Sequence, residues 1–315
     1  MTKNDRSVLF DDPIWKKALN KPFYAAKKLQ RKFSHVFEDA IRFSTQNPDE
    51  WGIVNQNEIR LVGLRRSGNH VLINWMRHQD DSVVQFLNDI PTGENPYRYR
   101  CEYFCDHYPE YPDEIQRLRQ QCQGNFKKKD YLIYNYEDYS LAKVFDPEFE
   151  KKHDWYLGKS RRRFDVLIMR DPFNLLASRI KRGFIHVKSS DRTFVELWKE
   201  YAKEYLGETS YSTQNKVCVN YNRWIQDIDY RRSLAETLGF KFSDANFSNV
   251  AGNAGGSSFD GTQYAQQASK MDVVGRWKHY QDDEFYRQLL SDRELLEYSD
   301  RIFGKIPGIE ALQLT

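Results

Sequence analysis

The sequence predicts an α/β fold in which a central parallel β-sheet is flanked by helices. Runs typical of strands buried on both faces occur at 59–64, 131–136 and 164–169. The first and third runs each end in a basic turn, after which apolar residues continue at helical spacing. With 315 residues, the chain is long enough to bury a large core between such a sheet and its helices.

The turn after the first predicted strand combines the features of an anion site. It consists of Arg65, Arg66, Ser67, Gly68, Asn69 and His70, and the predicted helix that follows carries its apolar residues at 71, 72, 75 and 76. A helix N-terminus presents free backbone N–H groups and the positive end of the helix dipole. Because two guanidinium groups stand beside that terminus, we expect the turn to bind a phosphate or a sulfate. The alternative is an inert, solvated basic turn.

This turn is not the phosphate loop of nucleoside triphosphatases. That loop, G-x-x-x-x-G-K-[ST], needs a second glycine, a lysine and a hydroxyl that binds magnesium. None of these stands in register around Gly68, so a different kind of anion site is predicted.

A second unit of strand, basic turn and helix covers residues 161–183. Its strand ends at Arg170-Asp171-Pro172, and Ser178 lies two turns along the helix that follows. Pro172 suits the start of a helix because its missing N–H costs nothing there. Two basic turns at the ends of parallel strands predict a ligand with two separated anionic groups.

Two acidic residues, Glu137 and Asp138, follow the predicted strand at 131–136. Open parallel sheets bind ligands at the carboxyl ends of their strands, so these carboxylates are candidates for chemistry. The alternative is that they are ordinary exposed acids of a loop.

Two further segments complete the predicted organisation. Residues 1–50 carry a basic amphipathic helical pattern, interrupted at Pro22, which we expect to pack on the core. Contact with a membrane or a partner is the alternative for this segment. Residues 51–315 are expected to form one domain. Within it, residues 88–130 are rich in Tyr, Pro, Asn and charge, which predicts an irregular insert that serves as a lid or part of a pocket.

Composition narrows the classes of function. The 48 basic and 45 acidic residues leave a net charge of +3, so no nucleic-acid partner is expected. A zinc site of Cys101, Cys105, His107 and Cys122 matches no strong spacing pattern, so we expect reduced thiols and no metal. The sequence shows no signal peptide and no apolar run of transmembrane length, which predicts a cytoplasmic protein.

The two basic turns together resemble the nucleotide-binding segments of sulfotransferases that use 3′-phosphoadenosine 5′-phosphosulfate (PAPS). In that family, a strand, loop and helix of the form x-K-S-G-T-T or R-K-G-G-T bind the 5′-phosphosulfate, and R-x-P-x-x-x-x-x-S binds the 3′-phosphate. Arg66-Ser67-Gly68 is similar to the first motif, with arginine for lysine. Arg170, Pro172 and Ser178 match the second, spacing included. The resemblance implies the P-loop NTPase-like sulfotransferase fold.

The C-terminal third extends the resemblance. A predicted strand at 216–221, a helix ending at Leu238-Gly239 and the segment Gly275-Arg276-Trp277-Lys278 are similar to segments of the family. The resemblance implies PAPS as co-substrate and no metal. Its implied phosphosulfate contacts are Arg65, Arg66, Ser67, Gly68, Asn69 and His70. Its implied 3′-phosphate contacts are Arg170, Ser178, Ser257, Ser258, Lys270 and Arg276.

The resemblance also suggests catalytic residues. Arg66 replaces the family's catalytic lysine, and its guanidinium can clamp two oxygens of the leaving phosphate without giving up a proton. The family's base is a histidine or, in several carbohydrate sulfotransferases, a glutamate. Glu137 stands at a comparable place and is our first choice, His107 is the second and His70 the third.

These inferences predict a PAPS-dependent sulfotransferase that moves a sulfuryl group to a hydroxyl or amine of a small-molecule or carbohydrate acceptor. One alternative is a P-loop nucleotide kinase or phosphotransferase, which needs a Walker lysine and magnesium ligands. The other is a non-catalytic protein that binds an anion or a nucleotide.

Overall fold

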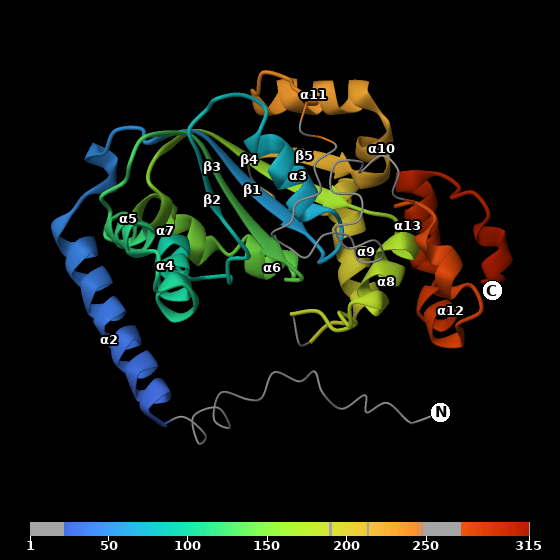
Figure 1. Ribbon diagram of the computed structural model, residues 1–315, viewed down its shortest axis with the longest axis horizontal. Coiled ribbons are helices and arrows are strands. Elements are labelled where there is room, and N and C mark those ends of the chain that lie inside the picture. Colours follow the sequence, from blue (N-terminus) through green and yellow to red (C-terminus); the bar gives the residue numbers. More distant parts are fainter. Residues whose placement is uncertain (1–21, 189–190, 213, 246, 248–271, 315) are drawn as a thin grey trace. The chain divides into compact units, whose positions relative to one another are not determined.

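The chain divides into two compact units, Met1–Trp51 and Gly52–Thr315. The computed structural model describes residues 22–188, 191–212, 214–245, 247 and 272–314 (Figure 1). The packing of the first unit on the second, expected from the sequence, stays a prediction.

In the first unit, helix α2 (Pro22–Thr45) precedes the 3-10 turn η1 (Pro48–Glu50). The sequence predicts a helical pattern interrupted at Pro22, and the described helix begins at that residue. Asn47 begins η1, since its side-chain oxygen accepts a hydrogen bond from the backbone N–H of Asp49 at 3.1 Å. Within the ranges that the structure describes, no helix is long and apolar enough to cross a membrane.

The second unit contains a parallel sheet in which five strands follow the order β2-β3-β1-β4-β5. The strands are β1 (Asn55–Gly63), β2 (Val84–Leu87), β3 (Lys129–Glu137), β4 (Ser160–Met169) and β5 (Asn215–Asn220). The central parallel sheet predicted from the sequence is therefore confirmed. Strand β2 was not predicted, because its four residues are too few to show a periodic pattern.

Strand register brings the candidate residues together at the carboxyl ends of neighbouring strands. Gly63, the last residue of β1, pairs with Glu137 of β3 on one side and with Ile168 of β4 on the other. The turns that follow these three strands therefore leave the sheet side by side, although they are far apart in sequence.

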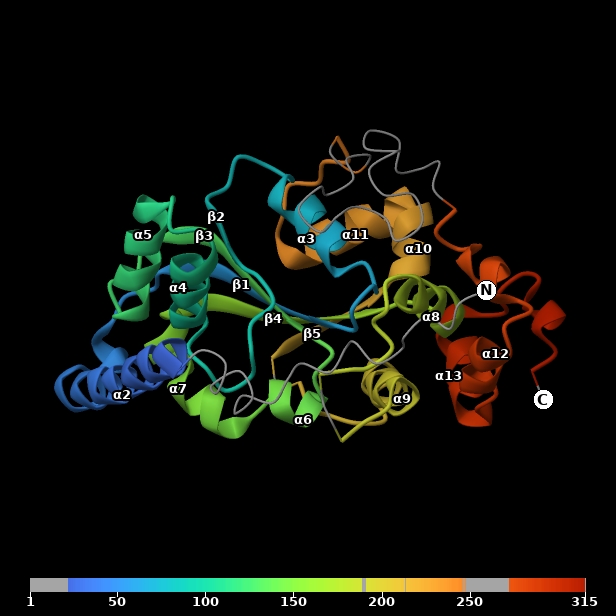
Figure 2. The same cartoon turned by 60° about the horizontal axis from the view of Figure 1, so that its bottom comes forward.

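Helices cover both faces of the sheet (Figures 1 and 2). One face buries its apolar side chains under α3 (Asn69–Arg77), α10 (Tyr221–Gln226) and α11 (Ile228–Leu238). The second apolar cluster includes side chains from α4 (Pro96–His107), α5 (Pro112–Cys122), α6 (Leu141–Val144), α7 (Pro147–Leu157), α8 (Pro172–Lys181), α9 (Phe194–Tyr205), α12 (Glu284–Leu290) and α13 (Arg293–Phe303). The short turns η4 (Arg276–Tyr280) and η5 (Ile309–Leu312) lie near the C-terminus.

Residues 88–130 are not irregular as the sequence suggested, whereas their role as a lid or part of a pocket stays a prediction. Two helices, α4 and α5, occupy much of this segment, and each begins with a proline at its first turn. The Asn95 side chain caps α4 by accepting a hydrogen bond from the backbone N–H of Arg98 at 3.2 Å. Tyr97 and Cys101 lie four residues apart and are both buried, so this helix has an apolar face that its tyrosines and charges conceal in the sequence.

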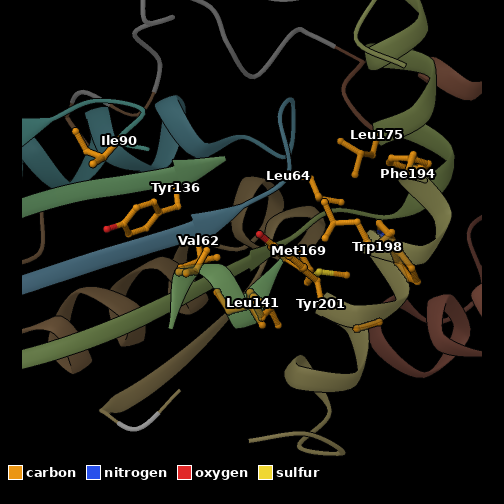
Figure 3. Close-up of a cluster of buried hydrophobic side chains, with 14 of the residues drawn as sticks. Val62, Leu64, Ile90, Tyr136, Leu141, Met169, Leu175, Phe194, Trp198 and Tyr201 are labelled. Carbon is orange, nitrogen blue, oxygen red and sulfur yellow. The ribbon is translucent and has the colours of Figure 1, made fainter. Parts of the chain in front are cut away.

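Helix α9 packs against the strand ends that carry the site. Figure 3 shows Val62 and Met169, from neighbouring strands, together with Trp198 and Tyr201 of this helix. The Trp198 indole N–H donates a hydrogen bond to the backbone oxygen of Arg170 at 3.1 Å, and the Tyr201 hydroxyl donates to that of Tyr139 at 2.8 Å. The core thus fixes the backbone directly after both β4 and β3.

Replacing Leu61 by alanine tests the central strand. Leu61 is fully buried in β1, so Leu61→Ala should lower the free energy of unfolding by about 2–5 kcal/mol through lost burial and a cavity. Val83 is 61% exposed, so Val83→Ala should change it by no more than about 0.5 kcal/mol. Urea unfolding measures both, and equal effects would contradict the assignment of Leu61 to the core.

Candidate active site

The turn between β1 and α3 has the backbone that an anion site needs. Arg66 has φ 73° and Gly68 has φ 100°, so two left-handed residues bend the chain sharply before the helix. Gly68 is the N-cap of α3 and provides no side-chain cap, so the first N–H groups of the helix are not capped by a side chain of that residue. A Cβ at Gly68 would collide with the ring of Tyr221, so a side chain is excluded there by space as well as by φ.

A buried ion pair holds the first residue of this turn in place. Asp138 and Arg179 are both fully buried, and Arg179 Nη1 lies 2.8 Å from Asp138 Oδ1. The same carboxylate oxygen accepts a hydrogen bond from the backbone N–H of Arg65 at 2.8 Å, while Arg179 donates to the backbone oxygen of Arg65 at 3.1 Å. Both backbone groups of Arg65 are therefore held, which fixes where the turn begins.

Glu137 is a buried carboxylate at the end of β3. Its Oε1 accepts hydrogen bonds from the side-chain amides of Asn69 at 3.0 Å and Asn135 at 3.1 Å. His70 Nε2 lies 3.5 Å from the same oxygen, and Arg65 Nε lies 4.0 Å from Oε2. The donors gather on Oε1, which leaves Oε2 as the oxygen with fewer partners.

Burial raises the pKa of the Glu137 carboxyl above its ordinary value. The charge of Asp89 adds to the rise, while His70 and the hydrogen bond from Asn69 oppose it. A carboxylate with a raised pKa is a stronger base than an exposed one, which is the property that proton abstraction requires.

A second basic cluster lies at the end of β4. Arg170 and Arg276 are both buried, and each donates a hydrogen bond from Nη1 to the Ser178 hydroxyl at 3.1 Å. Arg170 Nη1 also donates to the backbone oxygen of Arg66 at 3.2 Å, and its Nη2 donates to that of Val273. The two predicted basic turns are thus in direct contact.

The charge in this cluster is concentrated. Burial lowers the pKa of the Arg66 guanidinium to about 10, and the positive charges of Arg182 and Arg170 contribute to the fall. Arg170 is buried with its Nε making no hydrogen bond within the described part of the chain. A ligand anion would supply both the missing acceptor and the missing negative charge.

Asp171 and its amide partners orient the start of α8. The carboxylate accepts hydrogen bonds from the backbone N–H of Asn174 at 2.8 Å and from the side-chain amide of Asn222 at 2.8 Å. This network ties α8 to α10, and the Arg170 guanidinium lies 5.3 Å from the ring centroid of Tyr221 on α10.

The structure brings most of the predicted residues together. Arg65, Arg66, Ser67, Gly68, Asn69, His70 and Glu137 occur at the ends of β1 and β3, and Arg170, Ser178 and Arg276 adjoin them. The side-chain amide of Asn69 is committed to Glu137 and to the backbone oxygen of Leu64. Ser257, Ser258 and Lys270 lie outside the described residues.

His107 has contacts of another kind. It is exposed at the end of α4, where its ring stacks on Tyr103 with centroids 4.5 Å apart and its Nδ1 lies 3.0 Å from the Tyr103 backbone oxygen. These contacts stay within its own helix, so none of them links His107 to Glu137.

The sequence did not identify Arg179 or Tyr221 as residues of the site. It also marked Asp138 as a candidate for chemistry, whereas its carboxylate forms a buried ion pair that holds the turn. Arg179 carried a signal, since it stands among apolar residues of α8 where a charge must be paired if it is buried. Tyr221 carried none, because its contact with Gly68 joins elements about 150 positions apart in the chain.

The four cysteines are free thiols. Among the described residues, no three or more His, Cys, Asp or Glu side chains are grouped so that they could hold a metal ion.

Known proteins resemble this chain in structure. No protein-family model matches it, and no curated protein matches its sequence. The crystal structure of mouse sulfotransferase SULT7A1 complexed with PAP is similar over 78% of this chain and 90% of that one, with 13% identity and a TM-score of 0.40. The sulfotransferase domain of the Synechococcus PCC 7002 olefin synthase is similar over 83% of this chain and 99% of that one, with 13% identity and a TM-score of 0.48. The sulfotransferase domain of the curacin biosynthetic pathway is similar over 79% of this chain and 98% of that one, with 13% identity and a TM-score of 0.40. These similarities concern the fold alone.

Removing Asp138 tests the buried ion pair. Asp138→Ala should destabilise the fold by about 3–5 kcal/mol, because it leaves the fully buried Arg179 without its carboxylate. The control is Asp229→Ala, whose ion pair with Arg232 is on the surface and should matter by at most about 1 kcal/mol. Urea unfolding distinguishes the two, and an equally small loss for Asp138→Ala would show that the pair does not hold the turn.

Proposed function

We propose that this chain is a sulfotransferase that moves a sulfuryl group from PAPS to a hydroxyl or amine of a small-molecule or carbohydrate acceptor. The observation that carries the proposal is the convergence of Arg170 and Arg276 on Ser178, in contact with the turn that holds Arg66. This arrangement offers two adjoining anion sites, as a nucleotide with phosphate groups at both ends of its ribose requires.

The residues at the end of β4 would hold the 3′-phosphate. Arg170 and Arg276 supply guanidinium groups, and Ser178 between them supplies a hydroxyl. The Arg170 side chain is buried and its Nε makes no hydrogen bond within the described residues, so the site fits an anion.

The β1–α3 turn would hold the other end of the nucleotide. Arg66 and the N-terminus of α3 provide positive charge where negative charge develops on the leaving phosphate. PAPS, when bound, supplies a sulfuryl group whose bond to that phosphate breaks as the acceptor oxygen or nitrogen bonds to sulfur. Arg66 stabilises the charge without transferring a proton, since a guanidinium stays protonated.

Glu137 would accept the proton that the acceptor loses. Its raised pKa, its burial and its position beside the turn suit a general base. His70 approaches the same carboxylate and helps to orient it, so Glu137 remains the first choice and His70 a supporting residue.

Replacing Glu137 by glutamine should remove turnover while preserving the fold. Turnover should fall by about 10²–10⁴-fold, because the amide cannot accept the proton. In the wild type, kcat/KM should rise with pH through a pKa above the ordinary value of glutamate, about 4.3. The pKa of Glu137 is higher in the folded protein than in the unfolded chain, so ionising this carboxyl lowers the free energy of unfolding. Stability therefore falls as the pH rises from the unfolded pKa through the folded pKa. Glu137→Gln should therefore not lower the melting temperature at pH 8.

The pH profile and the melting curve check this prediction together. Full activity in Glu137→Gln would exclude Glu137 as the base and would turn attention to His107 and His70. A large fall in melting temperature would mean that the carboxylate is structural.

Adenosine 3′,5′-bisphosphate should stabilise the protein in the presence of a chelator. Ligand at 100 times its dissociation constant adds about 2.7 kcal/mol, which for a domain of this size raises the melting temperature by roughly 5–10 °C. Arg170→Ala should abolish most of this shift. Arg66→Ala should keep more of the shift but lose turnover with PAPS by about 10²–10³-fold.

Arg232→Ala is the matched control, because it removes a guanidinium from an exposed ion pair with Asp229. It should behave as the wild type. Stabilisation by ATP with magnesium, and not by the bisphosphate, would favour a nucleotide kinase. Binding of the bisphosphate without transfer from PAPS to any acceptor would favour a non-catalytic binding protein.

A further inference from the structure

A cavity of about 310 Å³ lies beside Glu137, between helices from the two faces of the sheet. Its walls come from α3, from β2 and the residue after it, and from α4 and its C-cap. They comprise His70, Ile73, Asn74, Arg77, Phe86, Asn88, Arg100, Tyr103, Phe104 and Tyr108. Its volume is in the range of pockets that bind small molecules.

One wall of this cavity leads to the candidate base. His70 lines the cavity, and its Nε2 is 3.5 Å from Oε1 of Glu137. A molecule held in the cavity would therefore have one end next to the group that accepts the proton.

The cavity is lined by two arginines and by no carboxylate. Among the described residues, neither Arg77 nor Arg100 has a carboxylate oxygen within 4.0 Å, the limit for an ion pair. An adjoining cavity of about 200 Å³ shares Arg77, Phe86, Arg100 and Phe104, so both guanidinium groups stand where the two spaces meet.

The carboxylates that act on Arg100 from farther away are already paired. Asp89 forms an ion pair with Lys188 and lies 3.5 Å from Arg65, and Glu114 accepts a hydrogen bond from Arg117 at 2.8 Å. Burial lowers the pKa of Arg100, which means that its charge is poorly compensated by the protein. A bound anion would compensate it.

Aromatic rings complete the cavity. Arg100 lies 4.5 Å from the ring centroid of Tyr103 and 5.3 Å from that of Phe104, and Arg77 lies 5.8 Å from that of Phe86. The rings lie beside the guanidinium groups and offer apolar faces against which a sugar ring or an aromatic ring can pack.

From these contacts we infer that the acceptor is an acidic molecule with a ring. Its carboxylate, sulfate or phosphate group binds Arg77 and Arg100, its ring packs on Tyr103 and Phe104, and its reacting hydroxyl or amine lies at the Glu137 end. This inference rests on the proposed function, since it assigns the cavity to the acceptor of that reaction.

Matched glycosides test the inference directly. The probes are 4-nitrophenyl β-D-glucuronide, the corresponding glucoside, and the glucoside 6-sulfate and 6-phosphate, which differ only in the acidic group. With adenosine 3′,5′-bisphosphate present, calorimetric titration should show that at least one acidic probe binds about tenfold to a hundredfold more tightly than the glucoside. The strongest of the three identifies the acidic group.

Arginine variants connect the preference to this cavity. Arg100→Gln and Arg77→Gln should reduce the preference for the acidic probe, measured as the ratio of the neutral glucoside's dissociation constant to that of the acidic probe, to about twofold or less. Arg119→Gln removes the same charge from an exposed position on α5 and should keep the full preference. Equal binding of charged and neutral probes, absence of binding included, would overturn the inference, and so would a preference that survives in Arg77→Gln and Arg100→Gln.

The two proposals fail in different ways. If the wild-type protein binds acidic and neutral glycosides equally well but is still stabilised by adenosine 3′,5′-bisphosphate, the proposed acceptor class is overturned and the sulfotransferase proposal stands. If the protein binds the acidic probes through Arg100 but its melting temperature does not rise with adenosine 3′,5′-bisphosphate, the anion-binding cavity would stand and the sulfotransferase proposal would fall.

Discussion

The site depends on the buried ion pair of Asp138 and Arg179. This pair connects the end of β3 with α8, and both of its members hold the backbone of Arg65. Arg179 also donates to the backbone oxygen of His186 at 3.1 Å, so the segment after α8 is attached to the same point. A buried ion pair adds little net stability, but it has few alternative geometries, which suits a turn that must present several donors in fixed positions.

That fixed turn lies among charges that the folded protein does not neutralise well. Burial and neighbouring arginines lower the pKa of Arg66, and burial with Asp89 raises that of Glu137. The two shifts have opposite chemical meanings, since one describes a cation short of negative charge and the other a carboxylate that retains its proton more readily. A cation with a lowered pKa that lies close enough to feel the charge of a carboxylate with a raised pKa is characteristic of a site that binds an anion and moves a proton.

The sequence was sufficient for the parts of the fold that depend on local pattern. The strands near 59–64 and 164–169 are apolar on both faces, and the glycine and proline after them mark the turns, so β1, β4, α3 and α8 were predictable. Helices α4 and α5 were not, because tyrosines and charges fill their sequence and only Tyr97, Cys101 and a few others are buried. The contact of Asp138 with Arg179 was beyond reach, since it follows from strand register and helix placement and not from spacing along the chain.

Strand order explains how one turn can serve two chemical tasks. Strand β1 stands between β3 and β4, so the turn that follows it has Glu137 on one side and the Arg170 cluster on the other. The acidic residue and the basic cluster can therefore reach a shared ligand from opposite sides without neutralising each other. Beyond β3 lies the short strand β2, and the cavity with Arg77 and Arg100 is next to this strand. In the proposed reaction, the nucleotide would thus lie over β1 and β4 and the acceptor would approach from β2, with the transferred group between them at the β1 turn.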